Sequence, residues 1–505
     1  MTTLFSMLDA WRPVRALVVG DYMLDQFVYG DAERLSPDAP VPVLSVRRTE
    51  DRPGGAANVC LDLVAMRAEV RAVGVVGRDE EGKRLRSALE EAGVGCAGLI
   101  ADPARPTTLK RSLVGLAQHR HPQKMFRMDV ESRAALDAER RADVLRACED
   151  ALAWAEVVLI EDYNKGVCAT DFCAALIAMC NARGTPVLVD PASLEEYSRY
   201  AGATCVTPNR TEAELAAGVR AETREDTPDS AEGVARTWAA LGTRLLEKHD
   251  LQTVVLTLDR HGALLLERGK EPVHLPTVAR QVYDVTGAGD MVLAALGAAI
   301  GNGASWEDAV RFANAAAGLE VEVFGVQPIP FERIHHALLR DHGRLAGKTR
   351  TLEEALIEVS AHRREGRSVV FTNGCFDLLH AGHVALLRHA AKQGDVLIVG
   401  VNDDGSTRRL KGEGRPVHAE RDRAEILGEL ESVDMVVLFA EDTPLRLIEA
   451  IKPDVLVKGG DYTPEQVVGH EAVLAHGGRI EIAPLLDGRS TTSAVRKIRA
   501  ATGAS

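Results

Sequence analysis

The middle of the chain carries Asp284-Val285-Thr286-Gly287-Ala288-Gly289-Asp290, directly before an Ala-rich run at residues 291–300. Glycines allow a tight turn, and the N–H groups of Gly287, Ala288 and Gly289 are expected at the start of the following helix, where they can hold an anion. Asp290 then lies beside that anion, where it can accept the proton of an attacking hydroxyl. An ordinary turn with a helix-capping aspartate is the competing interpretation.

Short Val/Ile/Leu runs alternate with longer Ala-rich amphipathic segments on both sides of this turn. The alternation is typical of an α/β fold with a mainly parallel sheet. Ligands in such sheets bind beyond the carboxyl ends of the strands. The predicted strands are residues 16–19, 157–160, 187–189, 254–256, 369–372, 396–401, 435–439 and 455–457.

The chain has 505 residues, more than one hydrophobic core usually organises, which indicates at least two domains. The alternation breaks between residues 329 and 349, where Pro328 and Pro330 precede a His/Arg-rich helical piece. We therefore predict a first domain at residues 1–330, a linker at 331–348 and a second domain at 349–505.

Net charge and composition indicate which classes of binding partner the protein can have. The formal net charge is −14, which argues against a nucleic-acid partner and favours small substrates held by a few local cations. No apolar run approaches the roughly 20 residues that span a bilayer, and the start lacks a secretory signal, so we expect a soluble cytoplasmic protein. The eight cysteines show no paired CxxC spacing and are expected to be reduced and buried.

A second motif follows the predicted strand at residues 369–372: Asn373-Gly374-Cys375-Phe376-Asp377-Leu378-Leu379-His380-Ala381-Gly382-His383. A helix beginning near His380 places His380 and His383 on one face, three residues apart. Two imidazoles at a positive helix end can stabilise a triphosphate while pyrophosphate is displaced. Zinc binding is the alternative, but the sequence nearby offers no third Cys or His ligand.

Residues 14 to about 328 resemble the ribokinase (PfkB) family of sugar kinases, because several motifs occur in that family's order. In addition to the Gly-rich turn, they are Gly20-Asp21, Gly54-Gly55-Ala56-Ala57-Asn58, Asn209-Arg210-Thr211-Glu212, Thr257 with Gly262, and Asn314. The chain departs from the family pattern at Asp259, which replaces the first glycine of the nucleotide turn.

This resemblance implies ATP and Mg²⁺ as cofactors, Asp290 as catalytic base, and a water-mediated contact from Glu212 to Mg²⁺. It further implies a monovalent cation near Asp284 and Thr286. The implied nucleotide ligands are Asn209, Arg210, Thr211, Glu212, Thr257, Gly262, Gly287, Ala288, Gly289 and Asn314. The implied sugar ligands are Asp21, Gly54, Gly55 and Asn58.

The stretch Glu161-Asp162-Tyr163-Asn164-Lys165-Gly166 resembles a segment of heptose-phosphate kinases within that family. The resemblance assigns Asp162 and Lys165 to substrate binding, and Lys110 is a further substrate-binding cation. Arg111 and Arg127 are two more cations available for a sugar phosphate, and a solvated surface base is an equally good interpretation of each cation.

Residues 349 to about 500 resemble the small cytidylyltransferase-like nucleotidyltransferases, with His380-Ala381-Gly382-His383 matching the family's His-x-Gly-His. The resemblance implies a Rossmann-like fold, smaller than the kinase domain, with His380, His383 and Lys411 as catalytic residues. The implied nucleotide ligands are Thr372, Asn373, Arg415, Lys458, Ser490, Thr491 and Thr492.

Together the two halves resemble the bifunctional enzymes that fuse a heptose 7-phosphate kinase to a heptose 1-phosphate adenylyltransferase. The resemblance implies phosphorylation of D-glycero-β-D-manno-heptose 7-phosphate at O1, removal of the 7-phosphate by a separate phosphatase, and AMP transfer from ATP to give ADP-heptose. It also implies a homodimer formed through a sheet lid, for which residues 40–52 supply strands.

Two alternatives stay open. The first is a kinase for another sugar phosphate fused to a cytidylyltransferase acting on a small polyol phosphate, because base preference depends on contacts that the sequence does not assign. The second is that one domain has lost catalysis and serves as a binding module, for which Asp259 is the only hint.

Overall fold

The computed structural model describes residues 2–116, 123–219, 231–277, 286–322, 327–341, 347–364, 366–460 and 462–484. The chain divides into two compact units, Met1–Ile334 and His335–Ser505. The division falls within the predicted linker at 331–348, inside helix α10 (Phe331–Asp341). The predicted domain limits themselves stay a prediction.

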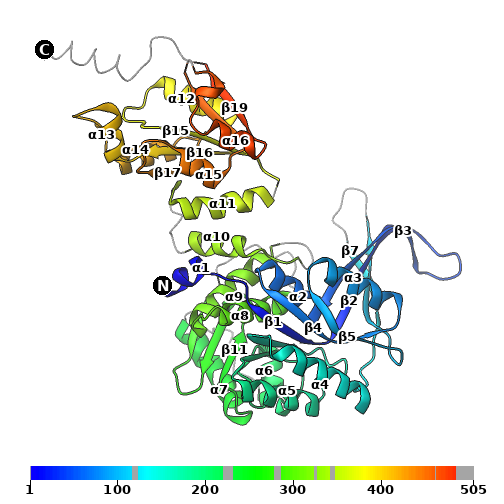
Figure 1. Cartoon of the computed structure of the whole chain (residues 1–505). Helices are drawn as coiled ribbons and strands as arrows, with labels where there is room; N and C mark the ends of the chain where they lie inside the picture. The colour runs from blue at the N-terminus through cyan, green and yellow to red at the C-terminus, as the bar shows by residue number, and fades with distance from the viewer. Residues whose placement is uncertain are drawn as a thin grey trace, which may run out of the picture. The chain divides into compact units, whose positions relative to one another are not determined.

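Unit 1 is built on a nine-stranded sheet in which β12 alone runs antiparallel to its two neighbours (Figure 1). Its strands, in spatial order, are β13 (Val273–Leu275), β12 (Ala263–Glu267), β11 (Thr253–Thr257), β10 (Cys205–Val206), β9 (Val187–Asp190), β8 (Val157–Glu161), β1 (Arg15–Gly20), β4 (Glu69–Gly77) and β5 (Gly95–Asp102). β8 is buried along its whole length and β1 at every residue after Arg15, as expected where helices cover both faces.

Helices cover the two faces of this sheet in separate groups (Figure 1). One face packs against α2 (Ala56–Ala65), α8 (Ala288–Gly301) and α9 (Trp306–Glu320). The other shares a continuous apolar core with α4 (Ala138–Leu152), α5 (Thr170–Arg183), α6 (Arg210–Ala217) and α7 (Ala231–Lys248). The remaining helices of the unit are α1 (Thr2–Asp9) and α3 (Glu80–Glu91).

A second sheet of four strands forms a lid on unit 1, in the order β3 (Pro42–Gly55), β2 (Tyr22–Leu35), β6 (Thr108–Gly115) and β7 (Gln123–Val130). The expectation that residues 40–52 supply lid strands is confirmed by β3. Because β2 follows β1 after a single residue and β3 runs into α2, the lid is joined directly to the main sheet.

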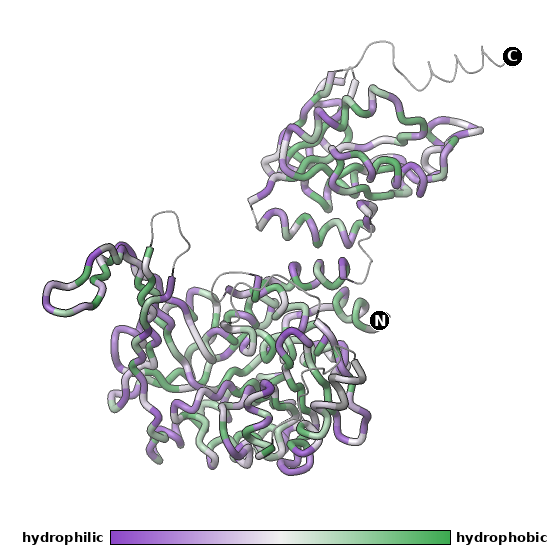
Figure 2. Tube along the Cα trace, turned by 180° about the vertical axis from the view of Figure 1, so that it is seen from behind, coloured by the Kyte–Doolittle hydropathy of each residue, from purple (hydrophilic) through white to green (hydrophobic). Residues whose placement is uncertain are grey.

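Unit 2 contains a six-stranded parallel sheet in the order β14 (Thr349–Arg350), β17 (Met435–Phe439), β16 (Val396–Asn402), β15 (Val369–Gly374), β18 (Val455–Gly459) and β19 (Arg479–Ala483). Two apolar clusters fill its faces, and Figure 2 shows hydrophobic residues running through the interior of this unit. The helices are α11 (Leu352–Arg364), α12 (Ala381–Ala391), α13 (Asp404–Lys411), α14 (Glu420–Gly428), α15 (Leu445–Ile451) and α16 (His470–Ala475).

The α/β prediction is confirmed, since each predicted strand lies within a strand of the structure. The helix after the Gly-rich turn begins at Ala288 rather than at residue 291, so Ala288 and Gly289 belong to its first turn. Within the described residues, no helix has both the length and the apolar composition needed to cross a membrane.

Candidate active sites

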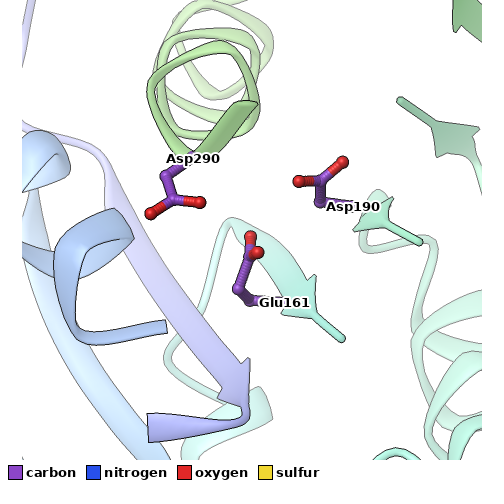
Figure 3. Close-up of side chains that lie close together, drawn as sticks. All are labelled: Glu161, Asp190 and Asp290. Atoms are coloured by element: carbon purple, nitrogen blue, oxygen red, sulfur yellow. The ribbon is translucent and has the colours of Figure 1, made fainter. Parts of the chain in front are cut away.

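The first site lies where parallel strands of unit 1 end and α8 begins. Glu161 and Asp190 are the last residues of β8 and β9 and stand opposite each other in the parallel register. Asp290 is the third residue of α8. Figure 3 shows the three carboxylates pointing toward one another. Each offers one oxygen, and these three oxygens lie within 4.8 Å of one another.

Asp290 is 5% exposed and both its oxygens accept hydrogen bonds. Asn58 Nδ2 donates to Oδ2 at 3.0 Å, and the Tyr163 hydroxyl donates to Oδ1 at 2.9 Å. Burial raises the pKa of Asp290 from 3.8 to about 6, and the two donors oppose this rise because they favour the charged carboxylate. A carboxylate with a pKa near 6 is ionised at neutral pH and remains basic enough to accept a proton.

Glu161 and Asp190 form an acidic wall beside this base. Burial raises the pKa of both carboxyls well above their usual values. The charge of Asp190 adds to the rise at Glu161, and the charge of Glu212 adds to the rise at Asp190. Asp190 accepts a hydrogen bond from Thr207 Oγ1 at 2.8 Å, whereas Oε2 of Glu161 is buried without a hydrogen-bond partner among the described residues. Oxygen donors gathered in this way suit a hard divalent cation such as Mg²⁺.

The Gly-rich turn brings the helix start close to this wall. Gly287 adopts φ 92°, which favours glycine, and is the N-terminal cap of α8. A Cβ added at Gly289 would lie 3.3 Å from Asp190 Oδ2, so a larger residue would crowd the acidic wall. The predicted amides of Gly287, Ala288 and Gly289 are thus at the N-terminus of a helix beside Asp290, as an anion site requires.

The sugar-side residues have partners of their own. Asp21 accepts the N–H groups of Tyr163, Lys165 and Val167, and therefore holds the loop after β8. Asn58, the N–H donor to Asp290, also donates to Asp62 at 3.3 Å. Of the two predicted glycines, Gly55 has φ 55° and caps α2, while Gly54 lies against Asp25.

Of the other predicted substrate residues, Lys110 lies in β6, and Asp162 and Lys165 lie on the loop after β8. Asp162 is buried and accepts hydrogen bonds from Arg199 and from the Tyr200 hydroxyl, at 3.0 and 2.6 Å. Lys165 Nζ pairs with Glu131 at 2.5 Å. Substrate binding by Asp162 stays a prediction. In the structure this carboxylate joins the loop after β8 to Arg199 and Tyr200.

The predicted nucleotide ligands gather at the ends of β10 and β11. Asn209 and Glu212 form a capping box at the start of α6, which contains Arg210 and Thr211, and Asn209 bridges to Thr257. Asp259 adopts φ 51° in the turn that follows, a backbone angle that favours glycine. Gly262 closes the turn at φ 84°. Asn314 donates to the Leu275 carbonyl at 2.8 Å.

Sequence reasoning missed Glu161, Asp190 and Tyr163 as members of the site. The available signal was an acidic residue ending each of two apolar strand runs, at Glu161 and Asp190. Tyr163 gave no local signal, because its contact with Asp290 joins segments 127 residues apart.

In unit 2, His380 caps α12 and its Nδ1 accepts the Gly382 N–H at 3.1 Å. The His380 and His383 rings stack with centroids 3.8 Å apart, which confirms that they share one face. Burial lowers the pKa of His383 to about 4, with smaller effects from His380 and Lys411. An imidazole with a pKa near 4 is neutral at pH 7, and burial also lowers the pKa of His380. Because Nδ1 of His380 accepts a hydrogen bond, the neutral form of this ring carries its proton on Nε2 and can donate from there.

Cations lie around the histidines. Lys411 ends α13, and Lys458 Nζ donates to Asn373 Oδ1 at 3.1 Å. Arg415 pairs with buried Asp377 at 2.8 Å. Thr372 is fully buried in β15, two residues before the strand ends. These residues lie around the carboxyl end of the sheet, as predicted for phosphate-facing groups.

Arg423 was not predicted, yet it is the largest fully buried side chain described. It donates to the carbonyls of His418 and Cys375 and pairs with Asp404, and so joins the loops around the histidines. The predicted residues Asp284, Ser490, Thr491 and Thr492 lie outside the described part of the chain.

Comparisons with known proteins cover both units. Residues 15–332 match the pfkB family carbohydrate kinase model, and residues 371–478 match the cytidylyltransferase-like model. Among solved structures, phosphofructokinase-2 from Escherichia coli in complex with potassium (18% identity, TM-score 0.51) covers 65% of this chain and 99% of its own. A carbohydrate kinase from Agrobacterium tumefaciens (22%, TM-score 0.51) covers 64% and 97%. These two likenesses show the fold alone.

Curated relatives match over nearly the full length. "Bifunctional protein HldE" of Geobacter sulfurreducens is 46% identical over 493 residues, which is 97% of this chain and 96% of that protein. The protein of the same name from Pseudomonas aeruginosa strain UCBPP-PA14 is 44% identical, over 96% and 97% of the two chains. Since these relatives cover both units at such identity, the chain belongs to the bifunctional HldE family, which joins a sugar kinase to a nucleotidyltransferase.

Proposed function

We propose that the two activities of this bifunctional enzyme of ADP-heptose biosynthesis, heptose kinase and adenylyltransferase, reside in separate sites around Asp290 in unit 1 and around His380 and His383 in unit 2. This division is supported by one observation: the residues around Asp290 all lie in unit 1, and the pair of His380 and His383 lies in unit 2. Unit 1 phosphorylates D-glycero-β-D-manno-heptose 7-phosphate at O1, and unit 2 transfers AMP from ATP to heptose 1-phosphate.

In unit 1, Asp290 accepts the proton of the anomeric hydroxyl as that oxygen bonds to the γ-phosphorus of ATP and the bond to the ADP oxygen breaks. The amides at the start of α8 stabilise the charge that develops on the transferred phosphoryl group. Asn58 and Tyr163 orient the carboxylate and keep it ionised. This role for Asp290 is supported by its burial and by its pKa near 6.

The kinase and adenylyltransferase families use ATP with Mg²⁺. Glu161 and Asp190 fit a magnesium site in unit 1, because their oxygens converge and Glu161 Oε2 has no partner in the described part of the chain. Glu212 faces Ser193 at 3.2 Å and would act through water, as the sequence predicts. Bound Mg²⁺ supplies charge neutralisation on the nucleotide phosphates.

In unit 2, the oxygen of the sugar 1-phosphate attacks the α-phosphorus of ATP, and pyrophosphate leaves. The neutral imidazoles of His380 and His383 donate hydrogen bonds to the phosphate oxygens, and Lys411 and Lys458 add positive charge. Arg415 can reach phosphate once it leaves Asp377. The reaction needs no covalent enzyme intermediate.

Four further parts of the proposal rest on the family resemblance: a homodimer formed through the lid, a monovalent cation near Asp284 and Thr286, a phosphatase acting between the two steps, and a cytoplasmic location. Sedimentation of the purified protein checks the dimer, and kinase rates in K⁺ against Na⁺ buffers check the cation.

The test incubates Asp290→Asn and His383→Ala variants with ATP-Mg²⁺ and each sugar phosphate, and identifies the products by mass spectrometry. Asp290→Asn should lose bisphosphate formation at least 100-fold and keep adenylyl transfer, because the two sites are independent. His383→Ala should show the reverse pattern. Loss of both reactions in either folded variant would refute separate sites.

A further inference from the structure

The lid carries two rows of side chains on one face. The strand registers align Arg52, Asp25, Lys110 and Asp129 across the four strands. The same registers place Phe27, Ser112 and Arg127 in the next row. Because side chains alternate between the two faces of a strand, these residues share a face, which we call the inner face.

The inner face lies over the kinase base. Lys110 Nζ lies 4.6 Å from the ring centroid of Tyr163, whose hydroxyl donates to Asp290. Lys165, on the same loop as Tyr163, pairs with Glu131 at the end of β7. The charges of Lys110 and Asp25 also act on the Asp290 carboxylate. Lys110 on the inner face is therefore in contact with a residue that holds the kinase base.

Two arginines on this face form ion pairs with carboxylates of the lid. Arg127 pairs with Asp129 at 2.5 Å, and Arg52 with Glu50 at 2.6 Å. Burial raises the pKa of Asp25, and the positive charges of Lys110, Arg127 and Lys124 oppose that rise. One guanidinium nitrogen of Arg52, Nη1, is buried without an acceptor among the described residues. The face thus holds several cations and a donor that lacks a partner.

The opposite face of the lid serves packing. Arg111, the neighbour of Lys110 in β6, donates to Gln26. Gln26 in turn donates to Asp51, which pairs with Arg84 of α3 at 2.6 Å. Arg111 is directed into this network, so the alternation along β6 separates two adjacent cations into different environments.

We propose that Arg52, Lys110 and Arg127 form the subsite for a phosphate monoester at the end of the sugar remote from the reacting hydroxyl. The inference rests on the proposed kinase function and adds the residues that select a phosphorylated sugar. A dianionic phosphate satisfies Nη1 of Arg52 and competes with Asp129 for Arg127, because guanidinium groups bind phosphate in a bidentate manner. Arg111 has no part in this subsite.

The test compares Arg127→Met with Arg111→Met in the full chain, using heptose 7-phosphate and unphosphorylated heptose as substrates. Loss of one charge-assisted contact should raise the KM for heptose 7-phosphate on the order of tenfold or more, with little change in kcat. The kcat/KM for unphosphorylated heptose should stay the same. Arg111→Met should behave as the wild type in both assays, and adenylyl transfer by each variant checks folding.

Equal KM values for Arg127→Met and the wild type would overturn the subsite, as would an equal rise in Arg111→Met. If the wild type forms no bisphosphate from heptose 7-phosphate, the proposed function fails instead. Titration with inorganic phosphate by calorimetry then tests the subsite without turnover, since binding should weaken in Arg127→Met and persist in Arg111→Met. Unchanged binding in Arg127→Met would refute the subsite on its own.

Discussion

The hydroxyl of Tyr163 donates to Asp290 at 2.9 Å, so Tyr163→Phe should raise the pKa of the kinase base. A hydrogen bond to a charged group contributes about 1.5–3 kcal/mol, and part of it survives when the carboxyl is protonated. A net loss of about 1.4 kcal/mol corresponds to roughly one pKa unit, from about 6 to about 7. The pKa rises because the Tyr163 hydroxyl stabilises the charged carboxylate, and the variant lacks that hydroxyl.

The acid limb of the kinase pH profile measures this shift, because activity falls as Asp290 becomes protonated. With a pKa near 7, the ionised fraction at pH 6 drops from about one half to about one tenth, so kcat/KM at that pH should fall about fivefold. At pH 8.5 the variant and the wild type should converge. Phenylalanine keeps the ring beneath Lys110, so the lid contact remains.

Tyr200→Phe is the matched control. Its hydroxyl donates at 2.6 Å to Asp162, a buried carboxylate that pairs with Arg199. The control should leave the acid limb in place. An acid limb in Tyr163→Phe that is unmoved, or shifted to lower pH, would refute the reasoning.

The remaining predictions concern both units. Because the pKa of His383 is lowered to about 4, adenylyl transfer should show no inflection near pH 6.5, and such an inflection in its rate profile would contradict a neutral imidazole. Arg423→Lys removes the guanidinium that donates to two part-buried carbonyls and should lower the stability of unit 2 by about 2–4 kcal/mol, measured by denaturant unfolding, with kinase activity as the control. Asp162→Asn breaks the pair with Arg199 and should destabilise unit 1 by about 3 kcal/mol while the sugar KM holds; a raised KM with unchanged stability would instead make Asp162 a substrate ligand.

Local patterns in the sequence predicted the elements and the centres of both sites. The periodicity of apolar residues placed the strands, because a strand buried under helices on both faces needs a continuous apolar run. The spacing of His380 and His383 put both rings on one side of α12, since three residues make nearly one helical turn. The Gly-rich turn before Asp290 also carried its own signal, because glycine meets the backbone angle there.

The tertiary structure decided which side chains meet. Glu161 and Asp190 approach Asp290 only because β8 and β9 are neighbours in the sheet and α8 begins beside their ends. Asp162 follows Glu161 directly, yet it turns to Arg199 and Tyr200.

In the lid, too, the tertiary structure decided which side chains meet. Lys110 and Arg111 are equivalent as adjacent cations in the sequence, and their separation onto opposite faces follows from the pairing of β6 with β2 and β7. A sequence specifies the chemistry of each residue and the spacing of residue types along a helix or strand. The partners that determine its burial, charge state and direction come from segments far along the chain, so only the folded structure assigns them.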